Sequence, residues 1–191
     1  FPTADTITAE TGGSERVRID SQGRLMIGTT TEGQGDADNL TVRDSGNCGI
    51  TIRSSNVGWG NIFFSDSTSG TGEYDGQIGY SQQHQYLKFG TASTERLRID
   101  SSGRVLIGTT TEGDVNADDL TVATTGNTGI TIRSSTGGLG TLAFSDGTSG
   151  SAEYEGYVQY QHNANALVLG SNHANALTLD SSQNATFAGT V

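Results

Sequence analysis

The stretch that decides the fold is ERLRIDSSGRVLIGT, at residues 95–109. Apolar and charged side chains alternate over Leu97–Ile99, as they do along a strand with one buried face. Ser101–Gly103 is a turn signal, and the apolar run Val105–Ile107 follows it. The segment therefore predicts a β-hairpin closed by a loop that contains glycine.

The same motif occurs again along the chain. Glu15–Ser21 reads ERVRIDS and Glu95–Ser101 reads ERLRIDS. The match continues without a gap over two copies of 80 residues, in which about 44 of the 80 aligned pairs are identical. A repeat of this regularity predicts an elongated array whose units mainly contact their neighbours. We expect the end of a preceding repeat at 1–10, full repeats at 11–90 and 91–170, and a partial third repeat or C-terminal hairpin at 171–191.

The remainder of a repeat is also predicted to be β-rich. Leu120–Val122, Ile130–Ile132 and Leu139–Phe144 are expected to be short strands. Tyr157–Tyr160 and Ala166–Leu169 are expected to form a second hairpin across a polar turn. No window of ten residues has a helical period, and glycine interrupts most runs. The fold class is therefore predicted to be all-β.

Composition and charge exclude several classes of protein. The chain has 10 Lys+Arg against 21 Asp+Glu, so no basic excess points to a nucleic-acid partner. No apolar run is long enough for membrane insertion as a helix. A single Cys cannot form an intrachain disulfide. The start at Phe1, without Met or a signal-peptide pattern, predicts a fragment or a processed chain.

The small apolar content predicts self-association. Only 32% of residues are hydrophobic, so one chain alone is not expected to bury a generous core. Strands of four to six residues also leave many unpaired edges. Close packing or intertwining of several copies would bury both the edges and the apolar faces. We therefore expect a slender, elongated, intertwined homo-oligomer of tandem 80-residue repeats.

The motif resembles a known class of viral protein. Residues 95–109 resemble a shaft repeat of bacteriophage tail fibres, notably those of marine phages. Residues 153–167 are similar to the segment before that repeat. Residues 184–191 are similar to the stretch before a C-terminal intramolecular chaperone, a self-cleaving peptidase domain. The first repeat departs from the second in detail, with Met26 at the place of Leu106.

The resemblance implies a homotrimeric virion structural protein of the phage tail, assembled in the host cytoplasm. Its implied role is that of a shaft or spacer that contributes to host attachment. The implied partners are two further copies of the chain, other virion tail proteins and a host cell-surface glycan or protein. The catalytic region of the chaperone is absent from these residues, so no catalytic residue is transferred from it. A capsule-degrading tailspike enzyme and a bacterial surface filament or adhesin stalk are the alternatives.

Acidic pairs are the first candidate for chemistry. Each repeat has two acidic residues two positions apart, with an Asp in a nearby loop: Glu73, Asp75 and Asp66, and Glu153, Glu155 and Asp146. On a strand the members of each pair would share a face, and a glycosidase needs two carboxylates. We favour solvated acidic residues at strand edges, because duplicated repeats would duplicate the active site and no cleft-forming insertion is present. We expect no enzyme activity.

Metal ligands and nucleophiles are sparse. Residues 146–150, DGTSG, lack the alternating acidic ligands of a calcium loop. His84, His162 and His173 lack close metal-ligand spacing, although His162 or His173 could converge as three His on a trimer axis. Cys48 stands where the second repeat has a threonine, so we interpret it as a buried small residue or an unreactive thiol. We expect no cofactor, no metal and no catalytic residue.

Two further groups of residues suggest contacts. The first repeat concentrates the aromatic residues Trp59, Phe63, Phe64, Tyr74, Tyr80 and Tyr86. Aromatic rings can stack on sugars, but burial against another chain is the simpler interpretation because large rings supply buried area. Arginines recur beside acidic residues in both repeats: Arg16 and Arg18 with Glu15 and Asp20, and Arg96 and Arg98 with Glu95 and Asp100. We interpret these as charge pairs on strand surfaces or between chains.

Overall fold

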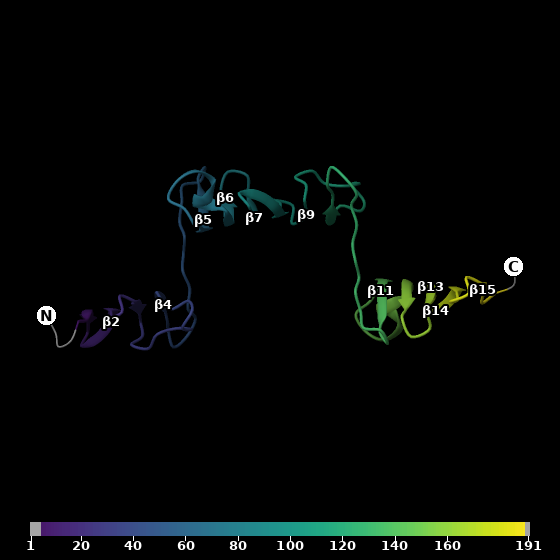
Figure 1. Ribbon diagram of the computed structural model, residues 1–191, viewed down its shortest axis with the longest axis horizontal. Helices are drawn as coiled ribbons and strands as arrows, with labels where there is room; N and C mark the ends of the chain where they lie inside the picture. The colour runs from purple at the N-terminus through teal and green to yellow at the C-terminus, as the bar shows by residue number, and fades with distance from the viewer. Residues whose placement is uncertain (1–4, 190–191) are drawn as a thin grey trace. The chain divides into compact units, whose positions relative to one another are not determined.

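The computed structural model describes residues 5–189, and over that range it contains β-strands, two short 3₁₀ helices and no longer helix (Figure 1). The predicted all-β fold class is confirmed. The strands form three open sheets.

The first sheet has the strand order β1-β2-β3-β4. Its strands are β1 (Ile7–Thr11), β2 (Ser14–Ile19), β3 (Leu25–Ile27) and β4 (Leu40–Val42). The pairs β1–β2 and β2–β3 are antiparallel, whereas β4 runs parallel to β3.

The second sheet has the strand order β10-β9-β8-β7-β6-β5. Its strands are β5 (Trp59–Phe64), β6 (Gly76–Ser81), β7 (Tyr86–Thr91), β8 (Thr94–Ile99), β9 (Val105–Ile107) and β10 (Leu120–Val122), with the 3₁₀ helix η1 (Gly70–Tyr74) between β5 and β6. The predicted motif hairpin is confirmed as the antiparallel pair β8–β9. The boundary between the two repeats, after Gly90, falls inside β7.

The third sheet has the strand order β11-β12-β13-β14-β15, and all its pairs are antiparallel. Its strands are β11 (Leu139–Phe144), β12 (Gly156–Gln161), β13 (Ala166–Ser171), β14 (Ala174–Leu179) and β15 (Ala185–Phe187), with η2 (Gly150–Tyr154) between β11 and β12. The predicted second hairpin is confirmed as β12–β13. The hairpin β14–β15 repeats the motif hairpin β8–β9.

Each of the first two sheets ends in a strand that runs parallel to its neighbour. The predicted strand Leu120–Val122 is confirmed as β10, but its parallel pairing with β9 was not foreseen. The Val105 N–H donates to the carbonyl of Asp119, and the Ala123 N–H donates to the carbonyl of Ile107. These hydrogen bonds hold β10 parallel to β9, after the long polar connection between the two strands. The Arg104 guanidinium contacts Asp100 at 2.7 Å and Asp118 at 2.8 Å, so it joins the hairpin turn to that connection.

One predicted strand is absent. Residues 130–132 form no strand, and neither do the equivalent residues 50–52. The prediction of a strand over Ile130–Ile132 is therefore wrong for the single chain. The physical reason is that a strand needs a hydrogen-bonded neighbour, and no described part of the chain lies beside these residues as a partner strand.

The buried core of the described chain is very small. Among residues 5–189 the buried apolar side chains are Met26, Leu106, Ala166 and Val168. Met26 pairs with Arg18 and Thr41 across the first sheet, and Leu106 pairs with Arg98 and Thr121 across the second. These small cores therefore lie on the faces that also present charged and hydroxyl side chains.

Candidate functional site: three exposed apolar faces

The strand register of the second sheet places apolar residues in continuous rows on one face. Residues that lie directly opposite each other point to the same side of a sheet. One such row crosses all six strands, through Ile62, Ile78, Phe89, Leu97, Ile107 and Val122. A second row runs through Tyr80, Leu87, Ile99, Val105 and Leu120. We call this side of the sheet, and its equivalents below, the apolar face.

The other two sheets repeat this arrangement. In the third sheet one row contains Leu142, Val158, Leu169, Leu177 and Phe187. In the first sheet a row contains Ala9, Val17, Ile27 and Val42. Each sheet therefore has one face on which a row of apolar side chains crosses the strands.

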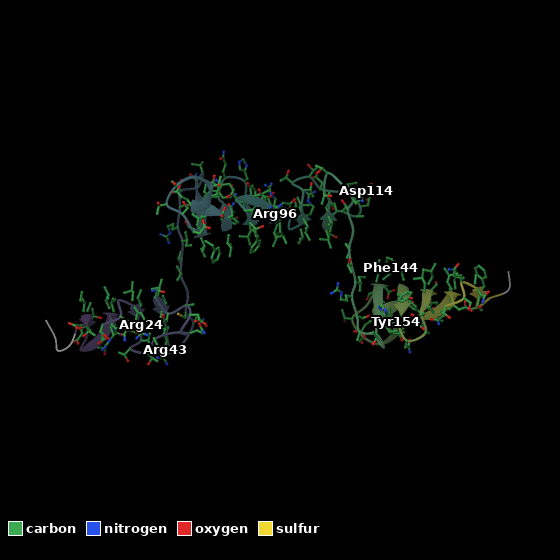
Figure 2. The ribbon with its side chains drawn as sticks, in the orientation of Figure 1. Arg24, Arg43, Arg96, Asp114, Phe144 and Tyr154 are labelled. Carbon is green, nitrogen blue, oxygen red and sulfur yellow. The ribbon has the colours of Figure 1, made fainter. Side chains whose placement is uncertain are left out.

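The apolar faces are open to solvent in the single chain. Ile62 is 48% exposed, Leu142 53% and Phe187 54%. Phe144, which Figure 2 labels in the third sheet, is 58% exposed. Large apolar patches of this kind on a protein surface mark interaction sites.

The total surface area supports the same conclusion. The chain exposes 13,668 Å², whereas two compact domains of the same total mass would expose roughly 10,000 Å². The surplus of roughly 3,000 Å² per chain is in the range that obligate oligomers bury.

The predicted charge pairs form within the chain. Arg18 contacts Glu15 at 2.6 Å on β2, and Arg98 contacts Glu95 at 2.7 Å on β8. The hydrogen bond from Arg18 lowers the pKa of Glu15 below its usual value. These pairs lie on the strand surface of the single chain, and a contact of the same residues with another chain stays a prediction. Arg16 and Arg96 instead donate hydrogen bonds to the hydroxyls of Thr11 and Thr91, each at 3.1 Å.

Asp20 and Asp100 have partners that the sequence reasoning missed. They bind Arg24 and Arg104, four residues further on, and not the arginines of the preceding strand. In both repeats an Asp lies four residues before an Arg, with the turn glycine between them. This repeated spacing could have predicted the two ion pairs. The hydrogen bond from Arg24 lowers the pKa of Asp20. Burial raises the pKa of Asp100, but the hydrogen bonds from Arg104 and Ser102 lower it by more. The pKa of Asp100 is therefore also below its usual value.

The acidic pairs do not lie on strands, so the prediction that each pair shares a strand face is wrong. Glu73 lies in η1 and Glu153 in η2, while Asp75 and Glu155 follow at the helix ends. Asp75 accepts a 2.8 Å hydrogen bond from the hydroxyl of Ser93, in the turn between β7 and β8. Glu155 lies 3.5 Å from Nδ1 of His173 in the equivalent turn of the third sheet. Asp75 and Glu155 thus each contact a residue of the turn that follows in their sheet, Ser93 and His173 respectively.

The cysteine and the three histidines lie at separate places in the described chain. Cys48 is exposed, so the alternative of a buried small residue is wrong, and its thiol donates to the carbonyl of Val42 at 3.3 Å. His84 stacks near Tyr86, and His162 meets Tyr160 edge-on at 4.9 Å. Within residues 5–189, no three His, Cys, Asp or Glu side chains group as metal ligands. A three-His site on an assembly axis stays a prediction.

The aromatic residues of the first repeat divide between the two faces of the second sheet. Tyr80 belongs to the apolar face, whereas Trp59 lies on the opposite face in register with Ser81 and Tyr86. Trp59 meets Tyr86 edge-on at 5.5 Å between ring centroids. Lys88 Nζ lies 4.6 Å from the Trp59 ring, and the Arg98 guanidinium lies 3.7 Å from the Tyr86 ring. We call Trp59, Tyr86, Lys88 and Arg98 the cation–aromatic stack.

No protein-family model matches the chain, and no curated protein is significantly similar to it. In the part of the chain that the structure describes, no helix is long and apolar enough to cross a membrane.

Proposed function

We propose that this chain is a shaft segment of a bacteriophage tail fibre, in which three copies associate through their apolar faces. The observation that carries the proposal is the row of apolar residues across all six strands of the second sheet. In the single chain Ile62, Phe89 and Ile107 of this row are exposed, and the other three residues are half-buried. The resemblance of residues 95–109 to fibre repeats supports the tail-fibre role and the number of three.

Burial of the apolar faces supplies the energy of association. Removing apolar surface from water stabilises a complex by roughly 25 cal/mol per Å² before the cost of association is subtracted. Three sheets, one from each copy, can turn their apolar faces toward a common axis at each level of the shaft. The turns, the charge pairs and the cation–aromatic stack then face outward.

The role that follows is mechanical. The shaft holds a tip away from the particle, and the chain is a structural protein of the virion tail with no enzymatic activity of its own. Three copies of a chain with a formal charge of −11 carry −33, which favours solubility and disfavours nonspecific adhesion to anionic cell envelopes.

A contact with a host glycan is a second candidate function, and the cation–aromatic stack favours it. Beside it lies a hollow of about 410 Å³, whose lining includes His84, Tyr86 and Arg98. The second repeat has Leu139 and Ala166 in place of Trp59 and Tyr86, so the stack is not needed to build the repeat. An aromatic ring can stack on a sugar, and a guanidinium can donate hydrogen bonds to its hydroxyls, so Tyr86 and Arg98 beside this hollow are suited to contact a glycan.

A glycan array tests the second candidate. Wild-type chain is expected to bind a subset of bacterial surface glycans, and Trp59→Leu is expected to lose that binding. The leucine of the second repeat makes this a conservative variant for folding. Equal binding by both proteins, or no binding by either, would reject the glycan contact.

Sedimentation equilibrium tests the main proposal. We expect a single species of roughly 59 kDa, three times the 19.8 kDa chain, at micromolar concentration. A compact single chain would reject self-association, and a dimer would reject the threefold arrangement. Immunogold labelling of intact phage particles then tests the location, because label on cell-surface filaments would instead identify a bacterial stalk.

A further inference from the structure

Two segments of identical sequence form no strand in the single chain. The sequence GITIRSS occurs at residues 49–55 and again at 129–135, although the residues on either side of it differ between the repeats. Its isoleucines are strongly exposed: Ile50 is 69% exposed, Ile52 47%, Ile130 70% and Ile132 53%. Alternation of isoleucine with threonine and arginine is typical of a strand with one buried face.

The backbone of these segments has no hydrogen-bonding partner in the described chain. The preceding ladder ends where the Arg43 N–H donates to the carbonyl of Ile27, and the next backbone bond is from the Gly58 N–H to the carbonyl of Ser55. No backbone N–H or C=O of residues 49–53 or 129–133 takes part in the hydrogen bonds of the described residues. Sequences with high β propensity and free backbone groups are templates for pairing with another chain.

The isoleucines of the first segment lie beside the apolar faces. Ile50 and Ile52 line a hollow of about 290 Å³ together with Ile62, Ile78 and Tyr80 of the second sheet. Ile50 also lines a hollow of about 390 Å³ with Leu40 and Val42 of the first sheet. The segment therefore extends the apolar surface at the edge of each of these sheets.

The second segment lies against the first strand of its sheet in the same way as the first segment does. A Cβ built on Gly60 would lie 3.4 Å from Cγ2 of Ile52, and a Cβ built on Gly140 would lie 3.6 Å from Cγ2 of Ile132. The same packing of an isoleucine against the first strand of a sheet thus occurs in both repeats.

We propose that residues 49–53 and 129–133 pair as β-strands with a second copy of this chain. The isoleucines then join the buried apolar surface between copies, while Thr51 and Arg53 point outward. This inference rests on the proposed self-association, and it names the segments through which the copies exchange hydrogen bonds. A second copy is the occupant because both segments border the apolar faces proposed to bind it, and because the surplus surface is large enough for an interface of obligate size.

Hydrogen–deuterium exchange of the full chain tests this inference, with peptides that cover residues 47–56 and 127–136. In the assembled protein we expect these amides to exchange at least about a hundredfold more slowly than in the unfolded chain, because a paired strand must open before it exchanges. Exchange at the unfolded rate in an intact oligomer would overturn the inference and leave the proposed function standing. Absence of any oligomer would overturn both.

A matched pair of variants provides a second readout. Thr51→Pro with Ile52→Pro removes two backbone donors, whereas Thr51→Ala with Ile52→Ala removes the same side chains and keeps the donors. We expect the proline variant to dissociate at a concentration at least about tenfold higher than the alanine variant. Equal association of the two variants would contradict strand pairing at this segment.

Discussion

Single aspartates hold the turn of each motif hairpin. The Asp100 side chain accepts hydrogen bonds from the backbone N–H groups of Ser102 and Arg104, at 2.9 and 3.0 Å. Asp20 and Asp180 occupy the same place and accept the equivalent bonds. In the partial third repeat Asn184 replaces the arginine and donates its side-chain amide to Asp180 at 3.0 Å. One residue type therefore closes all three turns.

These turns are expected to weaken at low pH. The hydrogen bonds to Asp20, Asp100 and Asp180 lower the pKa of each below the ordinary value of 3.8. Their stabilising contribution is fully present above that value and is lost as the pH falls through the lower folded-state pKa. We expect Tm to decrease below about pH 4. A variant with all three changed to Asn should show a flatter decrease, and an identical decrease would contradict this role.

The buried core is small, so single core residues are expected to matter. Leu106 is 1% exposed and Met26, at the equivalent place, is also 1% exposed. Leu106→Ala should lower the free energy of unfolding by about 2–5 kcal/mol, because it leaves a cavity. Leu106→Met should cost less than about 1.5 kcal/mol, since methionine already fills this place in the first repeat. Denaturant unfolding measures both, and equal losses would contradict the packing argument.

At the scale of elements, a glycine controls the parallel pairing of β3 with β4. Gly28 follows β3 with φ +72°, and a Cβ built on it would lie 2.1 Å from the carbonyl oxygen of Arg43. That carbonyl belongs to the residue after β4, so the two chain segments touch at this glycine. A side chain there would force the parallel strand away from the sheet.

Gly28→Ala and Gly13→Ala form a matched pair that tests this contact. Gly13 has φ +73°, almost the same as Gly28, but nothing lies within 4 Å of its built Cβ. Both substitutions pay about 1–2 kcal/mol for the left-handed backbone. Gly28→Ala should cost a further 1–3 kcal/mol or so, because of the clash. Equal Tm values for the two variants would show that the close approach is unimportant.

The turn between β7 and β8 shows how a tertiary contact supports an unfavourable local conformation. Ala92 and Ser93 have φ +49° and +58°, which side chains rarely adopt, whereas the first sheet has Gly12 and Gly13 at this place. The Ser93 hydroxyl bonds to Asp75, and its N–H donates to the Asp75 carbonyl. These contacts from the end of η1 offset the local strain.

At the scale of the whole molecule, the two faces of a sheet are expected to respond differently to charge. Ile62 and Phe63 are neighbours on β5 with almost equal exposure, 48% and 49%, but they point to opposite faces. The second repeat keeps a leucine at the place of Ile62 and has only Ala143 at the place of Phe63. Only the Ile62 side is therefore expected to be buried between copies.

Ile62→Glu should weaken assembly at least about a hundredfold, because it places an unpaired carboxylate in an apolar interface. Phe63→Glu should leave the dissociation constant within about threefold of wild type, since exposed substitutions have small effects. Sedimentation velocity over a concentration series measures both. Equal effects of the two variants would mean that the apolar face is not the surface that joins the copies.

The local parts of the fold could be predicted from the sequence alone. Alternation over Leu97–Ile99 and the glycine-containing turn act between residues that are close in the chain, so the hairpin β8–β9 and the hairpin β12–β13 were foreseen. The repeat also foretold that the same hairpin recurs in each sheet. Charge pairs were also predicted because arginines recur beside acidic residues in both repeats, and the pairs Glu15–Arg18 and Glu95–Arg98 do form.

Only the tertiary structure decided the pairings that depend on distant residues. Three features depend on contacts between residues far apart in the chain, which no local pattern encodes: the parallel partner of β9, the 3₁₀ helix that precedes Asp75, and the face of the sheet on which each aromatic ring lies. Residues 130–132 have the alternation of a strand and lack a neighbour to pair with. Alternation of apolar and polar residues predicts only which side chains are removed from water. A strand forms only where a second backbone segment completes its hydrogen bonds.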